Sequence, residues 1–222
     1  MAYKPSRLEQ WKEYLGDWIK YFGFGYENTK KLTAENTIIL VLDPLEIYRN
    51  LFNKQNIDSI TNLVLYAEKF KIPVVYTNWV RTRGLVDDQM DRKGHWSEFV
   101  PEYSSILSEL PRVNNIIHTI HTDAFATSWD LKKKTNIDNE LKRIIGNRKN
   151  IVICGSWTEA CVLTTARSAA HKNLNPVVYK PGTVGHGRAS SNAFLMIDKL
   201  YGYVVNGISF LPSADEGHVY QA

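Results

Sequence analysis

Short apolar runs recur along the chain and alternate with segments of helical periodicity. The runs are rich in β-branched residues and apolar throughout, which is typical of strands buried on both faces of a parallel sheet. Predicted strands cover residues 38–42, 73–77, 115–119, 151–154, 176–179 and 203–205. Predicted helices cover residues 57–70, 137–145, 161–171 and 191–201. The alternation predicts an α/β fold of three layers (αβα) around a central, mostly parallel sheet of six strands.

A separate amphipathic pattern precedes this region. Residues 8–22 place apolar side chains, including two tryptophans, at spacings of three and four, which predicts an N-terminal helix. A polar linker follows. We therefore expect residues 1–32 to form a helical extension and residues 33–222 to form the main domain. The aromatic face of this helix would pack on the domain or on another subunit, or would act as a lid over a pocket.

The composition excludes several classes of protein. Of the 222 residues, 44% are apolar and 23% are charged, which excludes disordered and fibrous proteins. Lys and Arg number 27 against 23 acidic residues, and only residues 132–134 form a basic triplet, so we expect no nucleic-acid partner. Neither Cys154 nor Cys161 belongs to a cluster with zinc-ligand spacing, so we expect neither a disulfide scaffold nor a zinc module.

The sequence also carries an expectation about location. The first residues lack the apolar segment of a signal peptide. The longest strongly apolar run, residues 38–42, is far shorter than the roughly 20 residues that a membrane helix needs. We therefore expect a cytoplasmic protein without a membrane partner.

Asp43 directly follows the first predicted strand, after five apolar residues. Ligands of parallel sheets bind beyond the carboxyl ends of the strands, so residues at these ends are candidates for function. A carboxylate at this point either caps a helix or turn, or serves as a functional group at the sheet edge.

The fourth predicted strand leads into a turn at residues 155–162. Thr158 can cap the next helix, and Cys161 would lie in the first turn of that helix. Unpaired backbone N–H groups there would stabilise a thiolate and would also bind an oxyanion. Alternatively, Cys161 is a small apolar residue that faces the sheet. Cys154 lies inside the strand and is interpreted as an inert core residue.

Two histidines lie three positions apart at the end of the third predicted strand. His118 and His121 suit proton transfer or ligand contact, or they are hydrogen-bonded structural residues. No third ligand lies at a convincing spacing, so we expect no metal. The glycine-rich residues 182–187 match no nucleotide-binding pattern and are interpreted as a mobile loop.

Other residues near strand ends are candidates for substrate contacts. Arg81 and Arg83 would clamp a substrate carboxylate, or they are solvated loop residues. Four aromatic residues either belong to the core or line a flat, apolar pocket: Trp79, Trp96, Phe125 and Trp157.

Together, these segments resemble the isochorismatase-like superfamily, also called cysteine hydrolases. The resemblance covers about residues 33 to 211 and is most specific at residues 155–162, which resemble the G-x-x-T-x-x-C-V nucleophile turn of the family. Three further segments resemble the first strand, the S-A-F-x-x-T segment and the segment before the third strand: residues 40–43, 123–127 and 94–102. The resemblance implies a six-stranded parallel sheet and a site built on an Asp-Lys-Cys triad.

By that resemblance, Cys161 is the nucleophile and Asp43 is the base that takes its proton. Backbone N–H groups of residues 157–161 would form the oxyanion hole, and a cis peptide is expected before Thr158. A thiolate would attack an amide or ureido carbonyl, and water would then cleave the thioester.

The sequence departs from the family pattern at three positions. Thr119 occupies the position of the triad lysine, for which His118 or His121 would substitute. Leu45 replaces the glutamine that usually follows the aspartate, and Lys180 replaces the aspartate that usually closes the fifth strand. Lys180 would return a positive charge to the pocket.

The leading hypothesis is a cofactor-independent hydrolase of small-molecule C–N bonds (amide, ureido or carbamoyl). The alternatives are an isochorismatase-type vinyl-ether hydrolase that uses Asp43, and a non-catalytic binding protein with the same fold. The resemblance also implies a homodimer or homotetramer. The expected catalytic residues are Asp43, Thr119, His121 and Cys161. The expected substrate-binding residues are Trp79, Arg81, His118, Phe125, Trp157 and Thr158.

Overall fold

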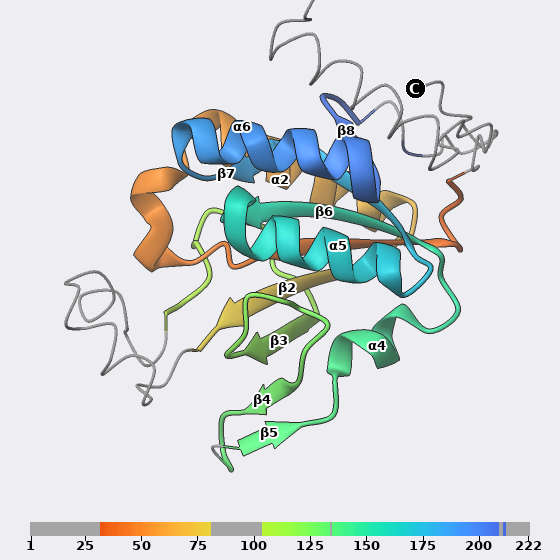
Figure 1. Cartoon of the computed structure of the whole chain (residues 1–222). Coiled ribbons are helices and arrows are strands. Elements are labelled where there is room, and N and C mark those ends of the chain that lie inside the picture. Colours follow the sequence, from red (N-terminus) through yellow and green to blue (C-terminus); the bar gives the residue numbers. More distant parts are fainter. Residues whose placement is uncertain (1–31, 81–103, 134, 209–210, 212–222) are drawn as a thin grey trace, which may run out of the picture. The chain divides into compact units, whose positions relative to one another are not determined.

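The computed structural model describes residues 32–80, 104–133, 135–208 and 211 (Figure 1). The predicted helix at residues 8–22, nearly all of the predicted extension, and Arg81 lie outside this part of the chain.

The described chain contains a six-stranded sheet in the order β3-β2-β1-β6-β7-β8, and every neighbouring pair is parallel (Figure 1). This confirms the predicted sheet. The strands are Thr37–Leu42 (β1), Val74–Trp79 (β2), Asn115–Thr119 (β3), Asn150–Ser156 (β6), Asn175–Val184 (β7) and Tyr203–Val205 (β8). The chain adds strands to one side of β1 and then crosses to add β6, β7 and β8 on the other. Strand order therefore reverses between β1 and β6, which is where parallel sheets bind ligands.

Helices cover both faces of the sheet. They are Lys54–Lys69 (α2), Glu140–Ile145 (α4), Leu163–His171 (α5) and Gly187–Met196 (α6), with shorter helical turns at Glu46–Leu51, Thr158–Val162 and Ile197–Tyr201. On one face, α4, α5 and the turn after α6 share a core with alternate residues of β1 and β6, namely Ile38, Leu40, Leu42, Ile151 and Ile153. Helix α2 packs on the other face, against β7 and β1.

The sequence explains where α2 begins and ends. Asn53 and Asn56 form a reciprocal capping box that satisfies backbone N–H groups of the first turn. The buried residues Ile60, Leu63, Val64 and Ala67 follow at helical spacing. After Phe70, Lys71 adopts a positive φ of 58°, which ends the helix before β2.

Two local predictions were wrong. Helix α4 begins at Glu140 rather than 137, because a short antiparallel hairpin precedes it, Ser128–Asp130 (β4) with Thr135–Ile137 (β5). Residues 182–184 belong to β7 instead of a loop, since β7 continues past a register shift to pair with Ser156. Asn139 caps α4 by accepting a hydrogen bond from the Lys142 N–H.

Gly155 allows β1 and β6 to approach closely at their carboxyl ends. It is paired with Leu42 and has φ 107°. A Cβ atom at this position would lie 2.6 Å from the Leu42 nitrogen and closer still to its carbonyl oxygen. Only glycine fits here, because both the conformation and the space exclude a side chain. The next residue on each strand, Asp43 and Ser156, is therefore brought into contact.

We predict that Gly155→Ala lowers the free energy of unfolding by about 3 kcal/mol or more, since a positive φ and a backbone clash combine. Gly187→Ala is the matched control, because Gly187 also has a positive φ (44°) but nothing lies within 4 Å of its added Cβ. The control should cost only about 1–2 kcal/mol. Chemical denaturation of both variants measures the difference. Equal losses would contradict the role assigned to the close strand approach.

Candidate active site

Asp43 is fixed by hydrogen bonds to its backbone and to its side chain. It follows β1 in the left-handed region (φ 45°) and is 2% exposed. Its N–H donates to Thr77 Oγ1 (2.8 Å), and the Thr77 hydroxyl donates to Asp43 Oδ1 (2.5 Å). Ser156 Oγ donates to the Asp43 carbonyl oxygen (2.7 Å). Strand β2 thus holds the carboxylate and the N–H of Asp43, and strand β6 holds its carbonyl oxygen.

Cys161 lies in a turn that β6 leads into. The turn is a π-helical one, Thr158–Val162, where the sequence predicted the start of an α-helix. The Trp157 carbonyl accepts from the N–H groups of Ala160 (3.0 Å) and Val162 (3.1 Å). The cis peptide joins Ser156 to Trp157, one bond before the one expected. Cys161 is 9% exposed, and its thiol lies close enough to the Asp43 carboxylate for each group to shift the pKa of the other.

Burial raises the pKa of the Asp43 carboxyl to about 6. Hydrogen bonds from Thr77, Cys161 and the Trp79 backbone N–H oppose this rise by stabilising the anion. Burial also raises the pKa of the Cys161 thiol well above its usual range, and the Asp43 charge raises it further. The backbone N–H groups of Trp157 and Cys161 act in the predicted direction and lower this pKa, but burial and the Asp43 charge outweigh them, so a thiol beside a carboxylate is favoured at neutral pH.

Aromatic rings surround the exposed part of Cys161. A small cavity of about 30 Å³ is lined by Tyr48, Trp79, Thr122, Trp157, Ala160 and Cys161. The Tyr48 and Trp157 rings meet edge to face, with centroids 5.6 Å apart. The walls are mainly apolar, so a bound group would be shielded from water beside the thiol.

A polar cluster ties the turn that carries Cys161 to the loop between β7 and α6 and to the start of α6. Glu159 accepts hydrogen bonds from the His186 N–H (3.0 Å) and from Ser190 Oγ (2.9 Å), and its Oε1 lies 2.7 Å from His186 Nδ1. The His186 ring contacts Trp157 edge to face at 4.7 Å. This cluster holds Trp157 in place over the cavity.

The structure brings some of the predicted site residues together and separates others. Asp43 and Cys161 meet, and Trp79 and Trp157 line the cavity with Cys161. Thr158 is buried, and its hydroxyl donates to the Val184 carbonyl (3.0 Å), so it supports the turn.

The predicted substitutes for the missing lysine lie elsewhere. Thr119 Oγ1 accepts a hydrogen bond from the His121 N–H (3.1 Å), and the His121 side chain is exposed. His118 is partly buried, and burial lowers the pKa of its imidazole while the nearby Glu140 charge opposes this. None of these three residues is among the groups that shift the pKa of Asp43 or of Cys161.

Two other expectations are corrected. Phe125 lines a different pocket, between α4 and α5. Lys180 is exposed, and its Nζ lies 5.4 Å from the ring of Phe194 on α6, so it returns no positive charge to Asp43.

Sequence reasoning missed Thr77 and Tyr48. The sequence does carry a sign of Thr77, because it is a polar residue in a mainly apolar strand. That strand pairs with β1, and Thr77 lies near the end of β1 that leads to Asp43. Tyr48 lies in a short helical turn after Asp43, and no pattern predicts its contact with Trp157, which depends on the tertiary fold.

Comparisons with known proteins agree with this geometry. The family model of the isochorismatase domain matches residues 37–207, more than half of the chain, so the chain belongs to the isochorismatase-like hydrolase family. No curated protein sequence matches it.

Solved structures share the fold at low sequence identity. A cysteine hydrolase from Pseudomonas syringae pv. phaseolicola has a TM-score of 0.59 and 16% identity, covering 78% of this chain and 90% of its own. N-carbamoylsarcosine amidase from Thermoplasma acidophilum has a TM-score of 0.60 and 16% identity, covering 76% and 94%. MAR1 ribonuclease from Caenorhabditis elegans has a TM-score of 0.61 and 14% identity, covering 81% of both chains. Because these proteins carry different names, the fold alone does not identify the substrate.

The described residues contain no group of three or more His, Cys, Asp or Glu side chains placed to hold a metal ion. None of their helices has the length and hydrophobicity required to cross a bilayer.

We predict that Asp43→Asn stabilises the fold at neutral pH. The folded pKa of about 6 lies above the ordinary value of 3.8, so Asp43 contributes stability below 3.8 that is lost as the pH rises through 6. Asn carries no charge and tolerates a positive φ. The free energy of unfolding of the variant, relative to the parent, should therefore rise by about 3 kcal/mol between about pH 3.5 and pH 7.5. If the difference in free energy of unfolding between variant and parent did not change with pH, burial of the Asp43 carboxylate would not destabilise the fold.

Proposed function

We propose that the protein hydrolyses C–N bonds of small amides, ureido compounds or carbamoyl compounds, with Cys161 as nucleophile and Asp43 as base. The observation that carries this proposal is the proximity of the buried Cys161 thiol to the buried Asp43 carboxylate, two groups that shift each other's pKa, next to a cavity that Cys161 lines. Membership in a hydrolase family supports it.

The reaction would begin as Cys161 Sγ attacks the substrate carbonyl carbon while its proton passes to Asp43. The resulting oxyanion would be stabilised by backbone N–H groups of the turn. The Ala160 N–H already donates to the Trp157 carbonyl, whereas the N–H groups of Trp157 and Cys161 lower the pKa of the Cys161 thiol and are therefore the best candidates. Asp43 would then protonate the leaving nitrogen as the C–N bond breaks, leaving a thioester.

Water would complete the cycle. Asp43, ionised again, would take a proton from the water that attacks the thioester, and the proton would return to the Cys161 sulfur as it leaves. A pKa of about 6 suits this double role, because the group is mostly ionised at neutral pH yet basic enough to carry a proton.

Thr77 would replace part of the role of the triad lysine. A lysine would stabilise the Asp43 anion by its charge, whereas Thr77 does so by a 2.5 Å hydrogen bond. A neutral donor stabilises the anion less than an ammonium would. The thiolate would therefore form during attack, with Asp43 as general base, and not before it.

The cavity supports a substrate with a small planar or apolar group. Tyr48, Trp79 and Trp157 supply aromatic walls around Cys161. The similarity to the fold of N-carbamoylsarcosine amidase supports ureido compounds as the first class to assay.

One observation favours a second candidate, vinyl-ether hydrolysis. The raised pKa of Asp43 also suits a general acid that protonates a vinyl carbon. Such a reaction would require Asp43 and not Cys161, so the two variants distinguish the candidates.

We predict that Cys161→Ala abolishes ammonia release from a panel of amides and ureido acids, a loss of at least about a thousandfold in kcat. Cys154→Ala is the control, because Cys154 is fully buried in β6 and should affect only stability. Turnover that survives Cys161→Ala but not Asp43→Asn would support the vinyl-ether mechanism instead. If no panel member shows Cys161-dependent turnover, the protein is not the proposed hydrolase.

We predict that kcat/KM falls as the pH drops below about 6, because protonated Asp43 cannot act as a base. Thr77→Val should move this limb to higher pH, since the Thr77 hydrogen bond lowers the pKa of Asp43. It should also lower kcat by about ten- to a hundredfold. Thr77→Ser, which keeps the hydroxyl, should restore both. An unshifted limb in Thr77→Val would assign Thr77 a purely structural role.

A further inference from the structure

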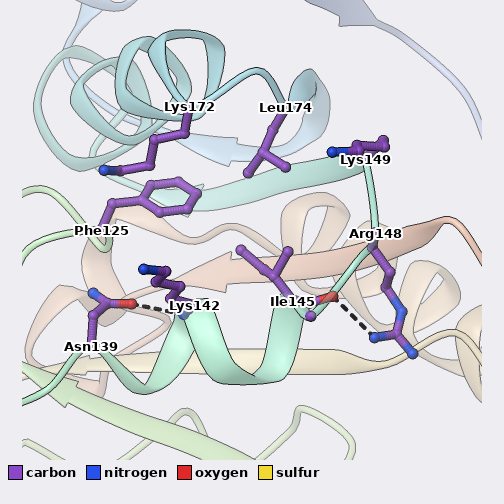
Figure 2. Close-up of a pocket in the computed structure, with 9 residues that line it drawn as sticks. Phe125, Asn139, Lys142, Ile145, Arg148, Lys149, Lys172 and Leu174 are labelled. Carbon is purple, nitrogen blue, oxygen red and sulfur yellow. Dashed lines mark hydrogen bonds between the residues drawn. The ribbon is translucent and has the colours of Figure 1, made fainter.

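A second pocket lies between α4 and α5, separate from the Cys161 cavity (Figure 2). Its volume is about 410 Å³, and the described residues that line it are Phe125, Asn139, Lys142, Ile145, Gly146, Arg148, Lys149, Lys172 and Leu174. Lys149 and Leu174 immediately precede β6 and β7. The pocket therefore extends toward the amino ends of these strands, whereas Asp43 and Cys161 follow the carboxyl ends of β1 and β6.

The charged residues of this pocket all carry the same sign. Lys142, Arg148, Lys149 and Lys172 contribute cations, and no carboxylate occurs among the described lining residues. Arg148 Nη1 donates to the carbonyl oxygens of Ile144 and Ile145 (both 3.2 Å) and so caps the C-terminal end of α4. The three lysines have no ion pair with a carboxylate anywhere in the described chain.

Three acidic residues lie near the pocket in the sequence, and none of them lines it: Asp123, and Asp138 and Glu140 on either side of Asn139. Asp123 precedes Phe125 by two residues, but its Oδ2 accepts a hydrogen bond from Ser168 Oγ (2.6 Å) and its Oδ1 accepts one from the Phe125 N–H (2.9 Å). Asp123 is not among the lining residues.

Three apolar side chains line the pocket between its polar residues. Figure 2 shows Phe125, Ile145 and Leu174 pointing into the space between the helices. Lys172 from the end of α5 and Lys142 from α4 reach toward Phe125 from opposite sides, and Lys172 Nζ lies 5.8 Å from the ring centroid. The pocket thus combines an apolar surface with positive charge at its rim.

We propose that this pocket binds a small organic anion that has an apolar, planar body and a phosphate-like charged group. The body would pack against Phe125, Ile145 and Leu174, and the anionic group would lie between Lys142 and Lys172. The volume falls in the range of about 300–1,000 Å³ that is usual for small-molecule sites. The pocket is partly open to solvent but bounded by α4 and α5, and its limited size favours a small ligand over an extended polyanion.

The test uses 1-naphthyl phosphate as probe, titrated calorimetrically into the full chain. Inorganic phosphate and 1-naphthol supply the charged group and the apolar body separately. The expected result is that 1-naphthyl phosphate binds at least about tenfold more tightly than either part, because both surfaces of the pocket contribute. Phe125→Leu should lower the affinity for 1-naphthyl phosphate and leave the affinity for inorganic phosphate unchanged.

Lysine variants locate the binding. The double variant Lys142→Gln with Lys172→Gln should weaken 1-naphthyl phosphate by about tenfold or more. Lys69→Gln is the matched control, because Lys69 also ends a helix and lies over a phenylalanine ring (5.3 Å from Phe70) but outside the pocket. The control should change affinity less than about twofold. No binding, equal affinity for phosphate alone, or an affinity that the double variant leaves unchanged would each overturn the proposal.

Discussion

The close approach of β1 and β6 determines the rest of the site. Gly155 has no side chain, so the backbones of β1 and β6 approach closely at Leu42, near the carboxyl ends of both strands. Asp43 and the Cys161 turn then emerge side by side at the point where strand order reverses. Hydrogen bonds from Thr77 and Ser156 hold Asp43 from the two flanking strands. A shift of either strand would separate the carboxylate from the thiol.

Burial of this pair sets its chemistry. The sheet and the aromatic walls exclude water from both groups, which raises both pKa values. No described lysine or histidine is among the groups that shift the pKa of either residue. The hydrogen-bond donors that lower these pKa values, Thr77 and backbone N–H groups, are neutral. A single negative charge is therefore carried by one couple of adjacent, buried groups. Such a couple can pass a proton between its members during a reaction without a separate cation, which is the basis of the mechanism proposed for the chain.

Most of the fold, but only part of the site, was predictable from the sequence. Uniformly apolar strands give a strong signal, and Asp43 and Cys161 follow from the ends of those strands and from the turn motif. The hairpin at residues 128–137 was missed because its strands are short and polar. Phe125 was misplaced because loop direction depends on packing. Thr77 could have been found, since a buried hydroxyl beside a strand-end carboxylate needs a partner.

The central claim is that Cys161 rests as a thiol whose pKa is raised partly by the Asp43 carboxylate. The most direct test is the pH dependence of iodoacetamide labelling at Cys161, followed by mass spectrometry in the parent and in Asp43→Asn, with Cys154 as internal control. The account predicts slow labelling of the parent at neutral pH, with a titration above that of a free thiol (about 8.5), and labelling at lower pH in Asp43→Asn because the charge is gone. Rapid labelling of the parent at neutral pH, or identical titrations of the two proteins, would contradict it.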